Sequence, residues 1–313
     1  MLDQAIASAP ASIGNVAVGF DILGQAFNAA HDTVVATRES EPGVRLGKVT
    51  GLVDSLPSEV NRNTALAAAA AVLEAAGNPF GVRLDIDKGV PMSAGMGGSA
   101  ASAVAAAAAV NALLPNPFET EELLPFTLEG ERVASDPPHW DNVMASLMGG
   151  LVLAAQESPP KLHMLPVPEG VVTVILHPSV KTETKTARAL LKTEVPLKTL
   201  IENSRRLATF IAGCASGNLD LVRAGFEDVL IEPQRAHLLE PFHQVKRAAL
   251  EAGALGCTFS GSGPSMFAWA EADKAAAVET AMAGAFTAAG LSATAYRTAS
   301  TEGVTVQRAR AAA

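Results

Sequence analysis

The sequence has few cysteines, and their spacing suggests neither a metal site nor a disulfide framework. Cys214 and Cys257 are the two cysteines among 313 residues, and neither belongs to a CxxC or another paired spacing. Paired spacings are typical of zinc sites and of small disulfide-bonded domains. We therefore expect neither feature. Two isolated thiols favour a reducing compartment, the cytoplasm.

The sequence also lacks an excess of positive charge. It has 23 lysines and arginines against 32 aspartates and glutamates, so its formal net charge is −9. Nucleic acids and anionic membrane surfaces attract basic proteins. We therefore expect no nucleic-acid partner and no membrane partner, although a local pocket for a small anion is compatible with this balance.

Two segments that resemble targeting or membrane-spanning sequences lack the features these need. The first residues, MLDQAIASAPAS, carry an aspartate where a secretory signal needs lysine or arginine, so we expect no such signal. Residues 89–118 carry no charge, but prolines and glycines limit any helix there to 99–114. Such a helix spans roughly 24 Å, less than the ~30 Å hydrocarbon core of a bilayer. We predict a buried helix and not a membrane span.

Length and periodicity predict two domains built from both helices and strands. At ~150 residues per domain, the chain is long enough for two. We expect a boundary at 158/159, with domains 1–158 and 159–313 and the proline-rich segment 156–170 as a linker. Helices and strands without a strict βαβ period predict an α+β fold. The expected strands are 2–9, 33–37, 82–90, 148–155 and 171–178, with a strand–turn–strand over 257–271, and the expected helices are 63–76, 99–114, 119–135, 184–192, 199–215, 221–230, 241–254 and, last, 273–289.

A glycine-rich turn leads directly into an alanine-rich segment, and together they indicate an anion site. Three glycines and a serine stand within 95–99, and an alanine-rich stretch continues to Leu114. The N-terminus of a helix has unpaired amide hydrogens and a partial positive charge, and glycines let backbone amides approach a phosphate closely. The sequence therefore predicts a phosphate-binding turn. A tight loop formed for packing alone is the alternative.

Two other nucleotide-binding motifs fit poorly. A Walker loop needs GxxxxGK before Ser or Thr, and the Gly47–Lys48 pair lacks the first glycine. The glycine turn superficially matches the dinucleotide pattern, with Glu119 about the expected ~20 residues on. That acid should end a strand, however, and here it starts an expected helix. A hydride-transfer enzyme is therefore disfavoured.

Three segments resemble the signature motifs of one enzyme family, the GHMP small-molecule kinases. They match in content, order and spacing: PASIGNVAVGFDILG (10–24), PMSAGMGGSAAS (91–102) and FSGSGPSMF (259–267). Three further segments resemble the homoserine kinases within that family: HWDNVMASLMGGLVL (139–153), KTETKTARALL (181–191) and IEPQRAHLLEPF (231–242).

This resemblance implies a fold, a reaction and an assembly. The implied fold is α+β, with a ribosomal-protein-S5-like N-terminal domain that binds the ATP phosphates and a ferredoxin-like C-terminal domain that completes the substrate cleft. The implied reaction transfers the γ-phosphate of ATP, with Mg²⁺, to the side-chain hydroxyl of L-homoserine, a step towards threonine. The implied assembly is a homodimer.

The resemblance also implies roles for individual residues. It implies metal ligands at Ser99 and Glu131, a hydroxyl and a hard carboxylate of the kind that Mg²⁺ binds. It implies catalytic roles for Asn15, Asp21 and Glu131. The implied ATP-binding residues are Asn63, Pro91, Met92, Ser93, Ala94, Gly95, Met96, Gly97, Gly98, Ser99, Ala100 and Ala101.

A free amino acid carries a carboxylate and an ammonium, and the resemblance implies groups for both. Arg188 and Arg235 can bind a carboxylate bidentately. Asp21 and Asp141 can receive the ammonium or the acceptor hydroxyl, and we assign Asp21 an orienting role while base catalysis stays open. Asn15 and His139 supply neutral polar contacts. The implied acceptor-binding residues are Asn15, Asp21, His139, Asp141, Arg188 and Arg235.

Some positions depart from the family pattern, and two other functions stay open. Gly98 stands where serine is usual, which removes one hydroxyl from the phosphates, and Trp140 stands near the acceptor where proline is usual. The third motif, 260–265, either reaches the phosphates or acceptor or is a structural β-turn. One alternative is a GHMP kinase for another alcohol, of the mevalonate or diphosphocytidyl-methylerythritol type. The other is a catalytically silent relative that binds a nucleotide or an amino acid.

Overall fold

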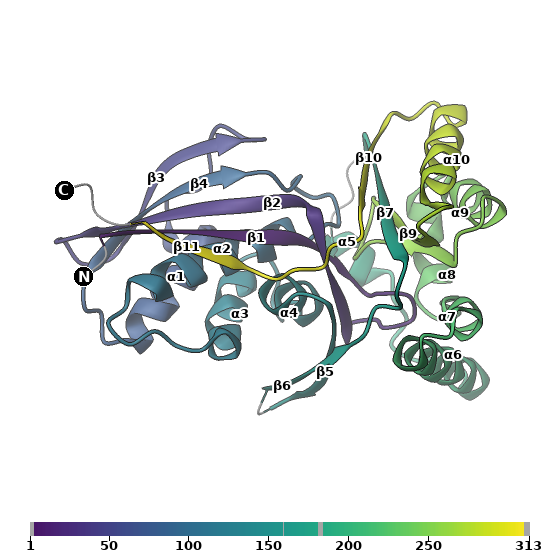
Figure 1. Cartoon of the computed structure of the whole chain (residues 1–313), viewed down its shortest axis with the longest axis horizontal. Helices are drawn as coiled ribbons and strands as arrows, with labels where there is room; N and C mark the ends of the chain where they lie inside the picture. Colours follow the sequence, from purple (N-terminus) through teal and green to yellow (C-terminus); the bar gives the residue numbers. More distant parts are fainter. Residues whose placement is uncertain (1–2, 159, 181–183, 310–313) are drawn as a thin grey trace.

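Two β-sheets, each with its own helices, form the two lobes of the molecule (Figure 1). The computed structural model describes residues 3–158, 160–180 and 184–309. The outermost residues of both predicted domains, residue 159 at the predicted boundary and the first three residues of the 181–191 motif lie outside the described residues.

The first sheet has seven strands, and all but one of its pairings are antiparallel. Its order is β11-β1-β2-β4-β3, β5 pairs with both β2 and β6, and β3 runs parallel to β4. In β4 and the second half of β2, buried positions alternate with more exposed ones, as in a sheet with one face on the core. The strands are β1 (Gln4–Gly14), β2 (Leu23–Glu39), β3 (Val44–Gly51), β4 (Gly81–Lys88), β5 (Leu151–Glu157), β6 (Pro160–Leu165) and β11 (Thr305–Ala309).

Four helices cover one face of this sheet (Figure 1). They are α1 (Thr64–Ala75), α2 (Gly98–Leu113), α3 (Leu124–Arg132) and α4 (Trp140–Met148), with short 3-10 turns at Val60–Arg62 and Thr120–Leu123. Helix α2 lies at their centre, because it contacts β1, β2 and the other three helices. Every residue from Ala100 to Leu113 is buried, and alanine side chains let the layers pack closely. The expected buried helix is thus confirmed; within the described ranges, no helix is long and apolar enough to cross a membrane.

The second sheet has the order β10-β7-β9-β8, and all neighbours in it are antiparallel. Its strands are β7 (Val171–Pro178), β8 (Gly256–Phe259), β9 (Met266–Glu271) and β10 (Ala293–Thr298). The helices of this lobe are α5 (Thr184–Ala189), α6 (Leu197–Ser216), α7 (Leu219–Gly225), α8 (Glu232–Arg235), α9 (Phe242–Glu251) and α10 (Ala275–Ala288), with a 3-10 turn at Ala236–Leu238.

Both faces of the second sheet are buried. Val174 and Met266 pack in the cluster that includes the buried sides of α9 and α10. Ile175 and Trp269 belong to another cluster, which extends through Phe210 of α6 into the first lobe. A strand buried on both faces needs apolar residues at successive positions, which explains the nearly continuous apolar run in β7.

A buried glutamine joins the two lobes. Gln25 of β2 accepts a hydrogen bond from the indole nitrogen of Trp269 (2.8 Å) and donates one to the hydroxyl of Thr173 (3.1 Å). All three side chains are almost completely buried. The lobes therefore share both an apolar cluster and a polar bridge.

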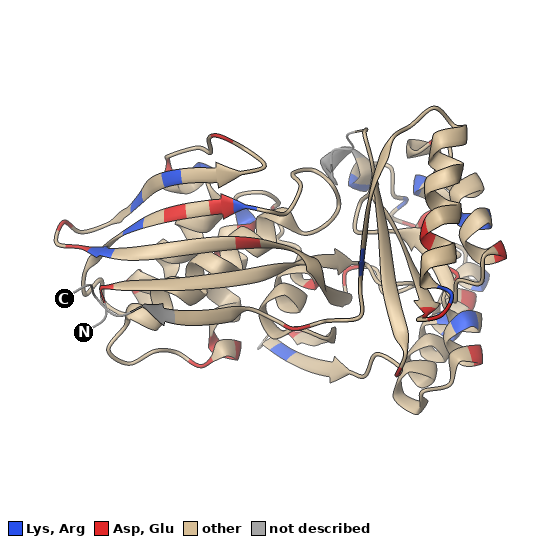
Figure 2. Cartoon of the chain, turned by 45° about the horizontal axis from the view of Figure 1, so that its top comes forward, with Lys and Arg blue, Asp and Glu red and all other residues tan. Residues whose placement is uncertain are grey.

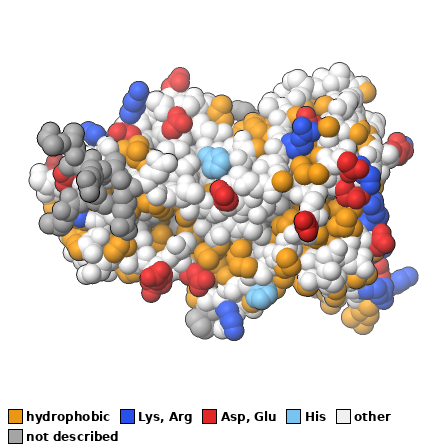
Figure 3. Space-filling view, in the orientation of Figure 1, with side chains coloured by type: hydrophobic (Ala, Val, Ile, Leu, Met, Phe, Trp, Pro, Cys, Tyr) orange, Lys and Arg blue, Asp and Glu red, His pale blue; other side chains and the backbone are white. Residues whose placement is uncertain are grey.

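Charged side chains of both signs are interspersed over the surface. Figure 2 shows acidic and basic residues on neighbouring positions of β3 and β4, and Figure 3 shows both signs spread over the face in view. Arg45, for example, pairs with both Glu39 and Glu41 at 2.8 Å. Charges of opposite sign therefore lie side by side on these strands.

The predicted α+β fold is confirmed, and most predicted elements are present within a few residues. Helix α1 begins after Asn63, whose side chain accepts hydrogen bonds from the amides of Ala65 (3.0 Å) and Leu66 (3.3 Å). The expected helix over 119–135 is a 3-10 turn followed by α3, with Pro125 in the first turn of α3, where its missing amide hydrogen does no harm.

Two expectations about the elements are wrong, and several strands were not expected. Segment 156–170 is no linker, because β6 forms a hairpin with β5. The helix predicted over 273–289 is not the last element, since β10 and β11 follow it and β11 pairs with β1. Strand β3 was not expected at all. The division at 158/159 stays a prediction, and two strands beyond it, β6 and β11, lie in the first sheet.

Candidate active site

A cavity of about 540 Å³ lies between the first lobe and the loops of the second lobe. The predicted site residues that line it are Asn15, Asp21, Asn63, Met92, Ser93, Ala94, Gly95, Gly97, Gly98, Ser99, Glu131, His139, Asp141, Arg188 and Arg235. Pro91, Met96, Ala100 and Ala101 are not among its lining residues: Met96 packs into the core from the turn, and Ala100 and Ala101 do so from the inner face of α2. The structure thus brings together most of the predicted set, from segments far apart in the sequence.

The glycine turn is shaped so that backbone forms the cavity wall. Gly95 and Gly97 have φ angles of 73° and 66°, in the left-handed region that favours glycine. A Cβ atom on Gly97 would lie 2.0 Å from the hydroxyl of Ser12, and one on Gly95 would lie 2.3 Å from the carbonyl oxygen of Ser260. Helix α2 begins directly after Gly97, so its unpaired amides and positive end lie at the cavity.

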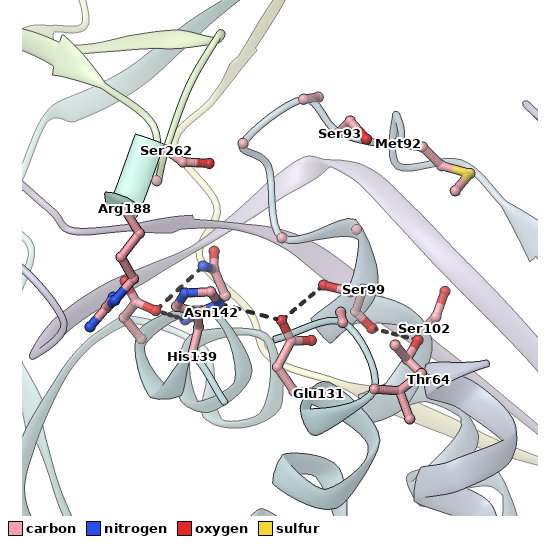
Figure 4. A pocket seen from close by; sticks show the side chains of 18 of the residues that line it. Thr64, Met92, Ser93, Ser99, Ser102, Glu131, His139, Asn142, Arg188 and Ser262 are labelled. Carbon is pink, nitrogen blue, oxygen red and sulfur yellow. Dashed lines mark hydrogen bonds and ion pairs between the residues drawn. The ribbon is translucent and has the colours of Figure 1, made fainter. Parts of the chain in front are cut away.

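Ser99 and Glu131 meet at the wall of this cavity, and His139 lies beside them (Figure 4). The Ser99 hydroxyl donates to Oε1 of Glu131 at 3.0 Å, and Nδ1 of His139 lies 3.9 Å from the same oxygen. Within the described part of the chain, the buried Oε2 of Glu131 has no hydrogen-bond partner. The Glu131 carboxylate raises the pKa of His139. The ring is therefore protonated more easily than an ordinary histidine, whereas we expected it to supply a neutral polar contact.

Asp21 and Arg188 form an ion pair across the cavity. The two guanidinium Nη atoms donate to the two carboxylate oxygens at 3.0 and 2.7 Å. Asp21 lies in the loop between β1 and β2, and Arg188 comes from α5 of the second lobe. In this arrangement each predicted acceptor-binding group neutralises the other.

Arg235 is a buried cation with few partners. Only 3% of its surface is exposed, and its Nε donates to the carbonyl oxygen of Ala187 at 3.2 Å. Neither of its two Nη atoms donates a hydrogen bond to a described residue. Burial lowers the pKa of this guanidinium, and the charge of Asp21 partly opposes that effect. An anion entering the cavity would therefore find an unneutralised cation at its wall.

Asp141 is a buried carboxylate at the start of α4. It accepts hydrogen bonds from the backbone amides of Asn15 and Asn142, each at 2.9 Å. Burial raises its pKa to about 6, the nearby Asp21 adds to this, and the positive charge of His139 opposes it. A Cβ on Gly14 would lie 2.4 Å from its Oδ2, so a residue without a side chain is needed where Asp141 approaches.

Asn15 connects three parts of the site. Its side-chain oxygen accepts the backbone amide of Asp21 at 2.9 Å, its side-chain nitrogen donates to the carbonyl of Gly261 at 3.2 Å, and its own amide binds Asp141. Asn63, in contrast, uses its side chain to cap α1 and to donate to the carbonyl of Pro57 at 2.8 Å. The side chain of Asn63 therefore holds the start of α1 in place, and its hydrogen bonds are to the protein backbone.

The third motif both braces the glycine turn and reaches the cavity. The hydroxyl of Ser260 donates to the carbonyl of Gly95 at 2.6 Å, and the amide of Gly261 donates to the carbonyl of Gly14 at 3.0 Å. Gly261 and Ser262 also line the cavity. The two readings of this turn are therefore compatible.

Some residues that line the cavity, among them Lys88, were not predicted from the sequence. Lys88 lines the cavity and its ammonium contacts the carboxylate of Asp32, the carbonyl of Gly98 (2.9 Å) and the hydroxyl of Ser102 (2.8 Å). The sequence did contain one indication that Lys88 lies near the glycine turn, because it is the last charged residue before the uncharged segment 89–118. Trp140 packs against the helical core and is not among the residues that line the cavity.

Comparison with known proteins gives matches over nearly the whole chain. The family profile described as the GHMP kinases N terminal domain matches residues 63–150, and the one described as GHMP kinases C terminal matches 210–288. The chain is 46% identical to a homoserine kinase of Xanthomonas campestris pv. campestris, over 95% of this chain and 92% of that protein. It is 37% identical to one of Chlorobaculum tepidum, over 89% of each.

Solved structures agree with these matches. A crystal structure of homoserine kinase from Cytophaga hutchinsonii superimposes with a TM-score of 0.94 at 36% identity, covering 98% of each chain. A crystal structure of mevalonate kinase superimposes with a TM-score of 0.68 at 13% identity, covering 95% of this chain and 99% of that one, which shows a shared fold. The three motifs, the cavity that they surround and these matches agree: the chain belongs to the GHMP kinase family and, within it, to the homoserine kinases.

Proposed function

We propose that this chain transfers the γ-phosphate of ATP to the side-chain hydroxyl of L-homoserine, giving O-phospho-L-homoserine and ADP in threonine biosynthesis. One observation carries this proposal: a single cavity holds a helix N-terminus suited to phosphates beside two carboxylates and two guanidinium groups suited to a free amino acid. The relatives named homoserine kinase, such as those at 46% and 37% identity, support the acceptor.

The phosphates of ATP bind at the glycine turn and the first turn of α2. Gly97, Gly98 and Ser99 line the cavity there, and their amides supply donors that need no side chain. Lys88 lies behind Gly98 and donates to its carbonyl oxygen, while its charge is balanced by the buried carboxylate of Asp32, so this pair holds the backbone of the turn in place. Gly98 lacks the hydroxyl of the usual serine, so backbone amides are the hydrogen-bond donors to the phosphates at this position.

Ser99 and Glu131 fit a magnesium site. A hydroxyl and a carboxylate are hard oxygen donors of the kind that Mg²⁺ prefers. The buried Oε2 of Glu131 has no partner among the described residues, although an unpaired buried carboxylate oxygen is costly. When bound, Mg²⁺ would neutralise charge on the phosphate oxygens.

The amino-acid end of the acceptor binds on the opposite side of the cavity. Arg235 and Arg188 hold its carboxylate, and Arg235 has two Nη atoms to offer. Asp141 holds the ammonium, since its buried charge is compensated best by a cation. Asp21 then orients the hydroxyl while Arg188 is shared between Asp21 and the substrate carboxylate.

The reaction needs orientation more than a strong base. The acceptor oxygen forms a bond to the γ-phosphorus, the bond from that phosphorus to the β–γ bridging oxygen breaks, and ADP leaves. Both oxygens of Asp21 are engaged by Arg188 in this structure, which supports the orienting role of Asp21. The hydroxyl proton leaves late in such a loose transition state and passes to an oxygen of the transferred phosphoryl group, so no base on the protein is required.

Two alternatives predict different behaviour. A kinase for mevalonate or a diphosphocytidyl-methylerythritol acceptor has no ammonium to bind, and Asp141 would then be a buried charge without a ligand. A silent sensor has no need of the Ser99–Glu131 pair. Both features therefore favour an active amino-acid kinase.

A coupled assay of ADP release tests the proposal. L-Homoserine, L-serine and mevalonate are offered at equal concentrations with ATP and Mg²⁺, and phosphorus NMR identifies the product. We expect turnover with L-homoserine well above that with the other two. A preference for mevalonate, or binding of ATP without turnover of any alcohol, would refute it.

We also propose a cytoplasmic homodimer. The isolated, buried thiols of Cys214 and Cys257 fit a reducing compartment, and burial raises the pKa of Cys214 to about 12. The dimer rests on family resemblance. Light scattering after size-exclusion chromatography measures the mass directly, and a mass near that of one 32.1 kDa chain would refute the dimer.

A further inference from the structure

Phe20 connects the two arginines of the acceptor site, although neither sequence nor charge singled it out. Its ring centroid lies 5.3 Å from the guanidinium carbon of Arg188 and 5.1 Å from that of Arg235. The same residue lines the cavity, directly before Asp21 in the first motif. One aromatic ring therefore contacts two cations that come from different helices of the second lobe.

Two guanidinium groups that lie against one ring repel each other; Arg235 is buried, so its charge is weakly screened, whereas Arg188 is exposed and is paired with Asp21. Burial lowers the pKa of Arg235 most, and the charge of Arg188 lowers it further. The face of an aromatic ring carries negative electrostatic potential and attracts a cation within about 6 Å of its centroid. It offers this attraction without a formal charge, so it does not compete with a substrate carboxylate as another aspartate would.

We propose that Phe20 is a positioning residue that sets the specificity for an α-carboxylate in the acceptor. By holding both guanidinium groups at one ring, it fixes the distance between them, so that both can bind the two oxygens of a single carboxylate. This inference rests on the proposed function and names the residue that selects amino acids over simple amino alcohols.

The test compares two acceptors that differ only in the carboxylate: L-homoserine and 3-amino-1-propanol. The wild-type protein is expected to prefer L-homoserine strongly in kcat/KM. Replacing Phe20→Leu removes the ring while keeping an apolar side chain. Because two cation–π contacts are lost, we expect KM for L-homoserine to rise by roughly 5- to 30-fold. The KM for ATP and the kcat/KM for 3-amino-1-propanol stay near their wild-type values.

Rescue by an aromatic residue separates the ring from mere packing. Phe20→Tyr keeps the ring and is expected to keep the wild-type preference, while Phe20→Met fills the space without a ring and behaves like Phe20→Leu. If Phe20→Leu fails to fold, the Tyr and Met variants decide the question on their own.

The chain offers a matched control. Phe80 lies under the guanidinium of Arg38, with 3.9 Å between that carbon and the ring centroid, and it does not line the cavity. Phe80→Leu removes the same kind of contact elsewhere, so it is expected to leave the preference between the two acceptors unchanged, whatever its effect on stability.

The outcomes separate the two proposals. A wild-type protein that does not phosphorylate L-homoserine overturns the proposed function and this inference with it. An active wild-type protein whose Phe20→Leu variant keeps its full preference for L-homoserine overturns the inference alone. Equal losses with both acceptors in Phe20→Leu also overturn it, because they indicate a general structural role.

Discussion

Glu131 illustrates how a single residue can be costly to the fold and useful to the site. Its carboxylate is 3% exposed, one oxygen binds the Ser99 hydroxyl, and the other has no described partner. Leaving a buried charge half satisfied destabilises a protein. A cation that binds there would remove this cost, so the arrangement is suited to a ligand.

We expect Glu131→Gln to lower kcat by about 10²-fold or more while homoserine binding is kept, because the variant keeps the shape but loses the charge beside the phosphates. Steady-state kinetics give kcat, and calorimetry gives the affinity for homoserine. Glu129, which is exposed on the same helix and pairs with Arg132, serves as control through Glu129→Gln. Normal turnover in Glu131→Gln would contradict the magnesium assignment.

Asp141 gives the site a dependence on pH. Burial raises its pKa to about 6, so in the free protein this carboxyl is largely protonated below that pH. A substrate ammonium favours the ionised form and lowers the pKa in the complex. Binding therefore releases a proton near pH 6, and affinity is lost as the pH falls through the pKa of the free protein.

We accordingly expect the KM for L-homoserine to rise about tenfold for each pH unit below 6, with little change between pH 7 and 8. Calorimetry at pH 6 in buffers of different ionisation enthalpy measures the released proton. Asp141→Asn should bind weakly at every pH and release no proton. His139 titrates nearby, and a slope that persists in Asp141→Asn would assign the effect to that ring instead.

At the scale of elements, the glycine turn and helix α2 act as one unit. Gly97 is in the left-handed region, its neighbour Ser12 leaves no room for a Cβ, and the third motif closes over Gly95. The bare backbone is therefore needed both for packing between motifs and for access of a phosphate to the amides. These two needs explain why glycines stand where a helix would otherwise be capped by a side chain.

Gly97→Ala should destabilise the protein by about 1–3 kcal/mol and raise the KM for ATP, because the new Cβ is strained in φ and would lie 2.0 Å from Ser12 Oγ. Chemical denaturation and kinetics measure both effects. In Gly284→Ala the new Cβ meets nothing within 4 Å, so this change inside α10 should stabilise by about 0.5–1 kcal/mol. If both variants behave alike, the turn is not the constrained element described here.

The elements that sequence predicted well are those with strong local signals. Helix α1 has a capping asparagine and a following glycine, and β7 has a nearly continuous apolar run. Strands β10 and β11 were missed because they are short, polar edge strands whose partners lie far away in sequence. Their formation depends on long-range pairing, which leaves little trace in local pattern.

The same limit applies to the site. The motifs predicted a phosphate turn and a set of acceptor residues because their residue types and spacing are distinctive, and most of these residues line one cavity. The Asp21–Arg188 ion pair, the Lys88–Asp32 pair and the contacts of Phe20 join positions that only the fold brings together. The sequence predicted Asp21 and Arg188 as site residues but not Lys88 or Phe20, and for none of them could it give the distance to a partner.

On the scale of the whole molecule, the two lobes behave as parts of one structure. An apolar cluster crosses between them, and Gln25 joins Trp269 and Thr173 inside it. The third motif of the second lobe also holds the glycine turn of the first. Anything that loosens this junction is therefore expected to disturb both stability and the site.

Gln25→Leu tests this coupling. The change leaves the buried indole N–H of Trp269 without its acceptor, which should lower the free energy of unfolding by about 1–3 kcal/mol. Gln4→Leu removes a similar bond, to Thr37 at 3.2 Å, on a partly exposed position of the first sheet, and should cost less than about 0.5 kcal/mol. Because the cluster is shared, denaturation should show one transition by both circular dichroism and tryptophan fluorescence. Two separate transitions in the wild-type protein would mean that the lobes fold independently, and that the cavity between them depends on weaker contacts than those described.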